Sequence, residues 1–169
     1  MALVTAATLE GKVKKPQLFK NLALAYAGNF VGSLLLVALA FYGAVLPGAA
    51  SAAPIAIATK KVSLTFTQAL CKGILCNWLV CMAVWCATNA QEVAGKALAI
   101  FLPISGFVAL GLDHSVANMF IIPYGMKLGA AITCKEFLFK NLLPVTIGNF
   151  LGGAGFVAGM YYAAFGGKK

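Results

Sequence analysis

The sequence predicts an all-α integral membrane protein, and two observations carry that prediction. Of the 169 residues, 62% are hydrophobic and only 10% are charged, whereas soluble domains carry roughly 25% charged residues. The charges are also unevenly distributed, and four stretches contain none: residues 21–59, 73–91, 97–112 and 141–167. Because a bilayer core takes about 20 apolar residues of helix to cross, such stretches indicate membrane spans rather than the core of a soluble domain.

The net charge is +9, and all 13 basic residues are lysines. A basic soluble domain would suggest a nucleic-acid partner, but these lysines lie at the ends of the apolar stretches. We therefore expect them to flank membrane spans, with no nucleic-acid partner. Four of them precede the first stretch and place that end in the cytoplasm by the positive-inside bias: Lys12, Lys14, Lys15 and Lys20.

The cysteines give no sign of a metal or redox centre. Cys71, Cys76, Cys81 and Cys86 recur every five residues, so successive side chains turn by about 140° around a helix and cannot share one face. The sequence contains no Cys-x-x-Cys pair and no Cys/His cluster. It therefore predicts neither a metal site nor a cofactor.

We expect a single transmembrane domain over residues 1–169 with four membrane-crossing segments. Pro16 suits the first turn of the first helix, and a linker rich in Ala, Gly, Ser and Pro follows at residues 47–54. The last segment ends before Gly166, Gly167 and two terminal lysines, a helix stop followed by cations. The expected segments are residues 16–45, 64–87, 95–126 and 137–165.

The third segment is too long for one clean span, and its middle contains Pro103 and several further interruptions. We expect two half-helices joined by an extended piece at residues 108–113. Irregular backbone at membrane depth is tolerated only where it is buried in protein or lines a cavity. Broken helices of this kind mark substrate sites in transporters, so the break predicts a transport pathway.

A repeat with an offset of 120 residues relates the first span to the last. Leu18-Phe19-Lys20-Asn21-Leu22 recurs at residues 138–142, and Gly28-Asn29-Phe30 recurs at residues 148–150. The chain thus holds the last span of one unit and all three spans of the next. An odd number of spans per unit inverts one unit relative to the other, as in many transporters.

The offset also predicts what faces the break. Shifting His114 back by 120 positions lands just upstream of Met1. We therefore expect the partner of the broken segment, with two more spans, in an N-terminal half-repeat that is absent from this sequence. The alternative is a four-span protein that starts at Met1, which is disfavoured because its irregular backbone would face lipid.

His114 is the main candidate functional residue. A lone histidine of a soluble protein is more often a satisfied core residue, but an ionisable group inside a span is costly and usually lines a pathway. Such a histidine can hold an anion by a hydrogen bond and, when protonated, hand it a proton. Asp113 either pairs with His114 or, as the favoured alternative, caps the second half-helix, whose remaining free amides favour an anion.

Amides and lysines provide further candidates. Asn77, Asn118 and Asn149 lie in otherwise apolar segments, where they either donate hydrogen bonds to a dehydrated ion or bind helices together. Lys61 either draws anions to the pore mouth or is an ordinary interface lysine. Lys72 either lines the pore or, as the favoured alternative, snorkels to the membrane surface. Three glycine pairs are expected to be close-packing faces: Gly28/Gly32, Gly148/Gly152 and Gly155/Gly159.

Three segments resemble motifs of the formate/nitrite transporter family. Residues 113–120 (DHSVANMF) resemble its (E)HSxANMF signature, and residues 73–81 (GILCNWLVC) match its GILxNxxVC segment. Residues 141–149 (NLLPVTIGN) match its N-[LI]-[IL]-P-V-T-[IL]-G-N run. The motifs occur in the family's order along the chain, and Asp113 replaces the usual Glu.

The resemblance implies a homopentamer of aquaporin-like protomers in a bacterial inner membrane, each with its own pore for formate, nitrite or hydrosulfide. It makes His114 the central pore histidine, Asn77 and Asn149 its neighbouring amides, and Lys61 the lysine on the outer side. The implied hydrophobic constrictions are Phe107 with Val80 on the outer side and Leu112 on the inner side.

The preferred mechanism has an anion gather near Lys61, lose water at Phe107 and meet His114. It then crosses as the ion or, after protonation, as the neutral acid, which avoids the cost of a bare charge in hydrocarbon. The expected partners are small monovalent anions, protons and membrane lipid. An aquaporin-like channel for water or neutral solutes is the alternative, although no Asn-Pro-Ala turn occurs. A membrane enzyme is disfavoured because no second acid/base or metal-ligand set accompanies His114.

Overall fold

The computed structural model describes residues 1–166, so the terminal lysines expected after the last helix lie outside the described residues. The all-α prediction is confirmed, because this part of the chain contains helices, turns and loops but no strand. The elements in chain order are α1 (Ala2–Leu9), α2 (Lys15–Tyr42), η1 (Gly48–Ser51), α3 (Ala52–Val62), α4 (Phe66–Asn89), α5 (Val93–Ala109), α6 (Ser115–Lys127), η2 (Glu136–Leu142), α7 (Leu143–Phe150), η3 (Leu151–Gly159) and α8 (Met160–Phe165).

Among residues 1–166, three helical stretches are long and apolar enough to cross a membrane, judged by length and composition. They are α2, α4 and the run Glu136–Phe165, in which η2, α7, η3 and α8 follow one another as a single rod with two π-helical stretches. The expected spans at 16–45, 64–87 and 137–165 correspond to these three. The expected broken span at 95–126 corresponds to α5 and α6.

The helices α2 and α4 begin at recognisable start signals. Pro16 lies in the first turn of α2, and the Gln17 side chain accepts a hydrogen bond of 3.0 Å from the Lys14 amide. At the start of α4, Thr65 and Gln68 form a reciprocal capping box with bonds of 3.0 and 3.3 Å. These bonds satisfy amides that a helix start leaves free, and they fix where α4 begins.

The third span is interrupted at residues 110–114, against the expected 108–113. Here α5 ends at Ala109 and α6 begins at Ser115. Gly111 has a φ of +61°, a left-handed conformation that glycine adopts without the steric cost of a Cβ atom. The break therefore turns the chain between two half-helices and leaves His114 at the N-terminus of α6.

The linker expected at 47–54 lies earlier in the chain, between the end of α2 at Tyr42 and the start of α3 at Ala52. Gly48–Ser51 forms a single 3₁₀ turn, and α3 starts at Ala52 with Pro54 in its first turn. A proline is tolerated there because the first amides of a helix have no intrahelical partner. The composition of this segment therefore resembles a loop although its last three residues begin a helix. From there α3 packs against α6.

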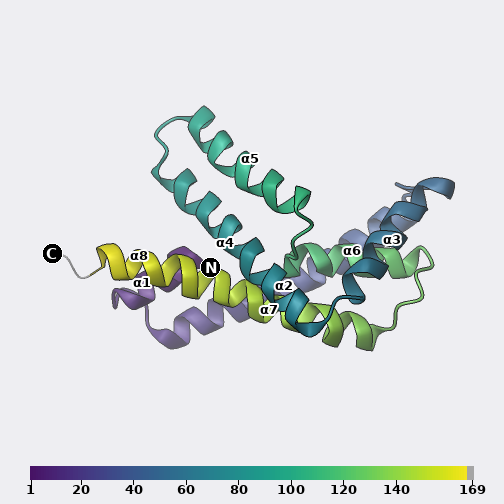
Figure 1. Ribbon diagram of the computed structural model, residues 1–169, viewed down its shortest axis with the longest axis horizontal. Helices are drawn as coiled ribbons and strands as arrows, with labels where there is room; N and C mark the ends of the chain where they lie inside the picture. Colours follow the sequence, from purple (N-terminus) through teal and green to yellow (C-terminus); the bar gives the residue numbers. More distant parts are fainter. Residues whose placement is uncertain (167–169) are drawn as a thin grey trace.

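The two repeat units are inverted, as predicted. Figure 1 shows α2 and the run from η2 to α8 extending in opposite directions along the long axis of the molecule. The side-chain hydroxyls of Tyr26 and Thr146 lie 2.9 Å apart, and these residues are separated by 120 positions in the sequence. In an inverted repeat, a two-fold axis relates the two units. Residues at equivalent positions can contact each other only where both lie close to that axis. This bond therefore marks an approximate two-fold axis between α2 and α7.

The helix α4 packs on α7 and η3 with almost no side-chain volume between the backbones. A Cβ atom added at Gly148 would collide with the Leu70 carbonyl oxygen, and one at Gly152 with that of Ile74. Gly73 on α4 also lies close to α7, since its Cβ atom would lie 2.8 Å from the Val145 carbonyl oxygen. The predicted close-packing face at Gly148/Gly152 is confirmed.

The other two glycine pairs do not form such faces in the described part of the chain. A Cβ atom added at Gly28, Gly32 or Gly155 would meet nothing within 4 Å, and one at Gly159 would meet only the Ala154 carbonyl oxygen at 3.7 Å. For these pairs close packing stays a prediction, because no element among residues 1–166 lies closely against them. Gly28 and Gly32 are thus uncovered in this chain, whereas their repeat equivalents Gly148 and Gly152 pack against α4.

Candidate functional site

His114 lies at the junction of the break and α6, where it separates two cavities. Its ring centroid is 6.4 Å from that of Phe107. One cavity, which we call the amide cavity, has a volume of 880 Å³, and the other, the lysine cavity, has a volume of 390 Å³. His114 belongs to both linings. The arrangement can bring a small solute to the imidazole from either side.

The amide cavity lies between α1, α2, α4, α6 and α7. Its lining is largely apolar, with a few amides and hydroxyls directed toward the space. This mixture is typical of small-molecule sites, where few polar groups fix the orientation of a ligand. Its polar lining residues are Tyr26, Asn29, Asn77, His114, Ser115, Thr146 and Asn149.

The lysine cavity lies on the other side of His114, between α3, the start of α4 and the break. Three lysines and one aspartate contribute to its wall, together with aliphatic side chains and one aromatic ring. Its charged lining residues are Lys60, Lys61, Lys72 and Asp113.

Asn149 is the residue that fixes the break in place. Its Nδ2 atom donates to the Gly73 carbonyl oxygen at 2.8 Å and to the Asp113 carbonyl oxygen at 3.0 Å. Its Oδ1 atom accepts a hydrogen bond of 2.8 Å from the Ser115 amide, the first amide of α6. Of the two interpretations of Asn149, the structure favours the one in which the amide joins helices. Both Nδ2 donors and the Oδ1 acceptor already bond to groups of the protein.

Asp113 adopts neither of the two roles expected for it. It makes no bond to the α6 amides, whose cap is the side chain of Asn149. Its Oδ1 atom accepts a hydrogen bond of 2.7 Å from Lys61 Nζ, and the Asp113 side chain is only 1% exposed. The capping prediction is wrong because the chain after Asp113 stays extended for one more residue, so that His114 occupies the N-cap position.

The ion pair of Lys61 and Asp113 belongs to a buried network. Asn118 Nδ2 donates to Asp113 Oδ1 at 2.9 Å and to Asn141 Oδ1 at 2.7 Å, and Asn141 Nδ2 donates to the Lys61 carbonyl oxygen at 2.9 Å. The Asn118 side-chain oxygen is buried and has no hydrogen-bond partner among the described residues. Lys61 therefore faces a compensating charge, and Asn118 is mainly a member of this network.

Asn77 lies on α4, where it reaches across to α7. Its Nδ2 atom donates to the Asn149 carbonyl oxygen at 2.5 Å and contacts Met1 Sδ at 3.7 Å. The side chain is buried and also contributes to the wall of the amide cavity. The structure thus brings Asn77, Asn149 and His114 together around one cavity.

The three candidate constriction residues are grouped differently from the expectation. Phe107 and Leu112 line the lysine cavity together with Lys61, whereas Val80 lines the amide cavity on the other side of His114. The structure thus does not bring Phe107 and Val80 to the same cavity, and their role as constrictions stays a prediction.

Two residues of the site were not anticipated from the sequence. Lys72, expected at the membrane surface, lines the lysine cavity and donates to the Gly111 carbonyl oxygen at 3.2 Å. The available signal was that it is the only charged residue between Lys61 and Glu92. Asn141 is a fully buried member of the ion-pair network, and its signal was its place in the repeated pentapeptide.

No ionisable cluster suited to a metal occurs in the described part of the chain. Among residues 1–166 there is no group of three or more His, Cys, Asp or Glu side chains that could hold a metal ion. The cysteines of these residues are free thiols.

Comparison with known proteins gives one consistent family. A family model described as "Formate/nitrite transporter" matches residues 1–163. Over 111 residues the chain is 50% identical to a probable formate transporter of Methanothermobacter thermautotrophicus, with coverage of 64% of this chain and 40% of the relative. It is 37% identical over 181 residues to the formate channel FocA of Escherichia coli strain K12, covering 95% of this chain and 63% of that protein.

A solved structure shares the fold. The structure described as a pentameric formate channel with formate bound superposes with a TM-score of 0.83 at 31% sequence identity, covering 92% of this chain and 69% of that one. The chain spans 40% and 63% of the lengths of the two relatives named above.

Proposed function

The chain belongs to the formate/nitrite transporter family, and on that premise we propose that it forms a conduction pathway for small monovalent anions through the two cavities that meet at His114. The observation that carries this proposal is that His114 lines both cavities. Anions in the lysine cavity lie near lysine side chains, and those in the amide cavity lie near amide groups. A solute that passes between the cavities passes the imidazole.

The substrates proposed are formate, nitrite and hydrosulfide. Formate is supported by the names of the relatives, which include a formate channel and a probable formate transporter. All three anions are small and singly charged, and each can accept a proton from an imidazolium. Passage as the neutral acid avoids placing a bare charge beside apolar side chains such as Phe107 and Val80. His114 is thus proposed to bind the anion and protonate it in passage.

The protein is proposed to act as a homopentamer in a bacterial inner membrane, in contact with lipid. The similar solved structure is described as pentameric. The helix α5 contributes no buried residue to the fold, and Leu98, Phe101 and Leu102 are each at least 59% exposed. Such an apolar surface requires cover from lipid or from a neighbouring protomer.

An N-terminal half-repeat is proposed as a further partner, and the uncovered face of α2 supports it. In the second unit, Trp78 and Trp85 of α4 stack on Phe156 and Tyr161 with ring centroids 4.9 and 4.4 Å apart. The repeat offset makes Leu36 the equivalent of Phe156, and Leu36 is 57% exposed. A helix equivalent to α4 is therefore proposed to cover α2.

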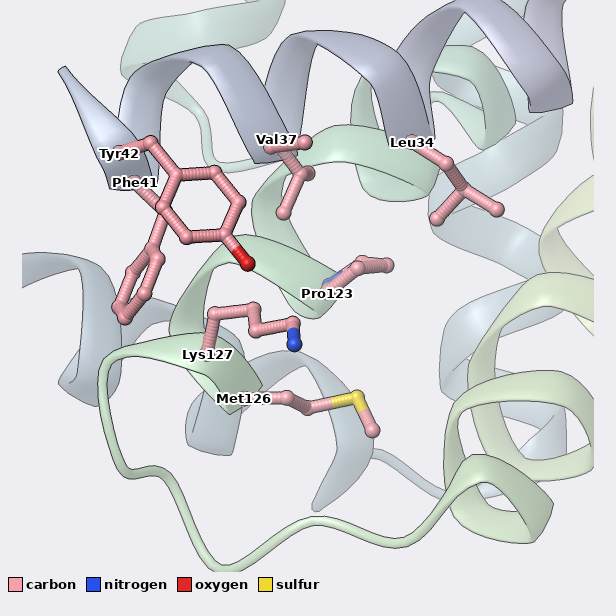
Figure 2. Close-up of a pocket in the computed structure, with 8 residues that line it drawn as sticks. Leu34, Val37, Phe41, Tyr42, Pro123, Met126 and Lys127 are labelled. Atoms are coloured by element: carbon pink, nitrogen blue, oxygen red, sulfur yellow. The ribbon is translucent and has the colours of Figure 1, made fainter.

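A different face of α2 from that of Leu36 borders a groove, shown in Figure 2. The groove has a volume of 490 Å³ and lies between α2 and α6. Phe41, equivalent to the covered Tyr161, lines it, and Lys127 reaches into it from the end of α6. The groove shares no lining residue with the two His114 cavities. It therefore supports a role in assembly rather than in conduction.

The proposal predicts anion flux from the purified protein reconstituted in liposomes. Formate, nitrite and hydrosulfide should each enter the vesicles at a rate that saturates with concentration, because each must pass His114 one at a time. Osmotic swelling in a neutral medium should stay at the level of empty vesicles. The competing aquaporin-like function would give the opposite pattern, rapid swelling with no anion entry, and that outcome would reject the proposal.

A further inference from the structure

Lys72 occupies a position that an ordinary membrane-flanking lysine does not. It lies in the second turn of α4, yet its side chain crosses to the break between α5 and α6, where Nζ donates to the Gly111 carbonyl oxygen at 3.2 Å. The same side chain lines the lysine cavity together with His114. The ammonium is thus held beside the space that leads to the imidazole.

The partner of Lys72 is available because the helix is interrupted. Gly111 lies in the non-helical segment, with a φ of +61°. An α-helical carbonyl would accept from an amide four residues later, whereas this oxygen accepts from Lys72. This hydrogen bond fixes the position of the Lys72 ammonium, because it anchors the free end of an otherwise flexible side chain.

The charges of the lysine cavity are not equivalent. The Lys61 ammonium is 2.7 Å from the Asp113 carboxylate, so its field is largely compensated. Lys60 also lines the cavity but is exposed to solvent. Lys72 is half-buried and has no carboxylate within 4.0 Å among residues 1–166. Of the three lysines, Lys72 therefore combines an uncompensated charge with partial removal from water.

The ammonium also retains hydrogen-bonding capacity. A lysine side chain carries three N–H donors, and the bond to Gly111 uses one of them. Two donors remain for a ligand in the cavity. The cavity of 390 Å³ accommodates a small anion with several waters, since a water occupies about 30 Å³ in the liquid. Its aliphatic and aromatic walls strengthen an electrostatic contact by limiting the water around it.

We propose that Lys72, rather than the Asp113-paired Lys61, is the anion-binding cation of the lysine cavity and holds a small monovalent anion next to His114. This inference rests on the proposed conduction of anions through that cavity. It replaces the earlier expectation, in which Lys61 gathered the anion. In this account Lys61 stabilises the fold around Asp113, and the recruitment of the anion depends on the second turn of α4.

The test uses the variant Lys72→Gln. A glutamine amide keeps a donor for the Gly111 carbonyl oxygen but removes the charge, so it separates anchoring from anion binding. The formate concentration that gives half-maximal flux into liposomes should rise by about tenfold, the lower end of electrostatic enrichment in charged clefts. Lys72→Arg should stay within about twofold of the wild type, because it keeps both charge and donors. Lys127→Gln, at a lysine that lines neither His114 cavity, is the matched control and should also change little.

A second measurement does not depend on transport. Sodium formate should raise the melting temperature of the detergent-solubilised wild type more than sodium gluconate does, and Lys72→Gln should lose that difference. If the wild type conducts no anion, the proposed function fails, while the formate-dependent melting shift still decides the role of Lys72. Half-maximal concentrations and melting shifts that are equal in the wild type and Lys72→Gln would overturn the inference. A raised half-maximal formate concentration and a lost formate-dependent melting shift in Lys72→Gln, with wild-type values of both in Lys72→Arg, would support it.

Discussion

Lys61→Met is expected to lower the free energy of unfolding by about 3–5 kcal/mol, the usual cost of removing one partner of a buried ion pair. The Asp113 side chain is 1% exposed and receives hydrogen bonds from Lys61 Nζ at 2.7 Å and from Asn118 Nδ2 at 2.9 Å. Without Lys61, its carboxylate would remain buried with one amide donor. Denaturant titration of the purified protein in mixed micelles, followed by circular dichroism, measures this loss.

The double variant Lys61→Met/Asp113→Asn provides the control. An asparagine keeps the oxygen that accepts from Asn118 and carries no charge, so most of the lost stability should return. Recovery of at least about half of the loss is expected, because a neutral replacement of both partners of a buried pair is often close to neutral in stability. Equal destabilisation by the single and the double variant would show that the Lys61 aliphatic chain, and not the ion pair, carries the effect.

Gly148→Ala and Gly152→Ala are each expected to destabilise the protein by about 1–3 kcal/mol, the range for overpacking a close contact. The added Cβ atoms would collide with the carbonyl oxygens of Leu70 and Ile74. Backbone atoms of a helix cannot rotate away as the end of a side chain can, so α4 would have to separate from α7. The same titration in micelles measures the effect.

The repeat supplies a matched control at Gly28. This residue is the equivalent of Gly148, but no atom lies within 4 Å of a Cβ atom added to it. Gly28→Ala should therefore leave the stability of this chain unchanged or raise it by up to about 1 kcal/mol, since alanine favours the helix. In membranes, the bulkier Gly28→Leu should reduce the yield of assembled oligomer, because it would block a helix on α2. Loss of stability with Gly28→Ala equal to that with Gly148→Ala would contradict the difference between the two faces.

Much of the fold could be predicted from local patterns. Apolar runs placed the three long helices, and the interruption around Gly111 placed the break within two residues at its start. The 120-residue repeat predicted the inversion, which the Tyr26–Thr146 bond marks. The start of α3 was missed because alanines and a proline in a first helical turn have the composition of a linker.

The members of the site could be identified, but their partners could not. Asn149 bonds to atoms of Gly73 and Ser115, which lie 76 and 34 residues away in the sequence. Asp113 pairs with Lys61, 52 residues away. Such pairings depend on how α3, α4 and α7 cross, and periodicity within one segment carries no information about that. The same limit applies to Phe107 and Val80, which lie on opposite sides of His114.

Formate influx into liposomes as a function of external pH, compared between the wild type and His114→Phe, tests the central role of His114 most directly. A phenyl ring fills a similar volume but can neither bind nor protonate an anion. His114→Phe is expected to lower the flux by about a hundredfold, the lower end of what a positioned proton donor contributes, and to remove its pH dependence. Unchanged flux with an unchanged pH dependence would rule out the proposed role of His114.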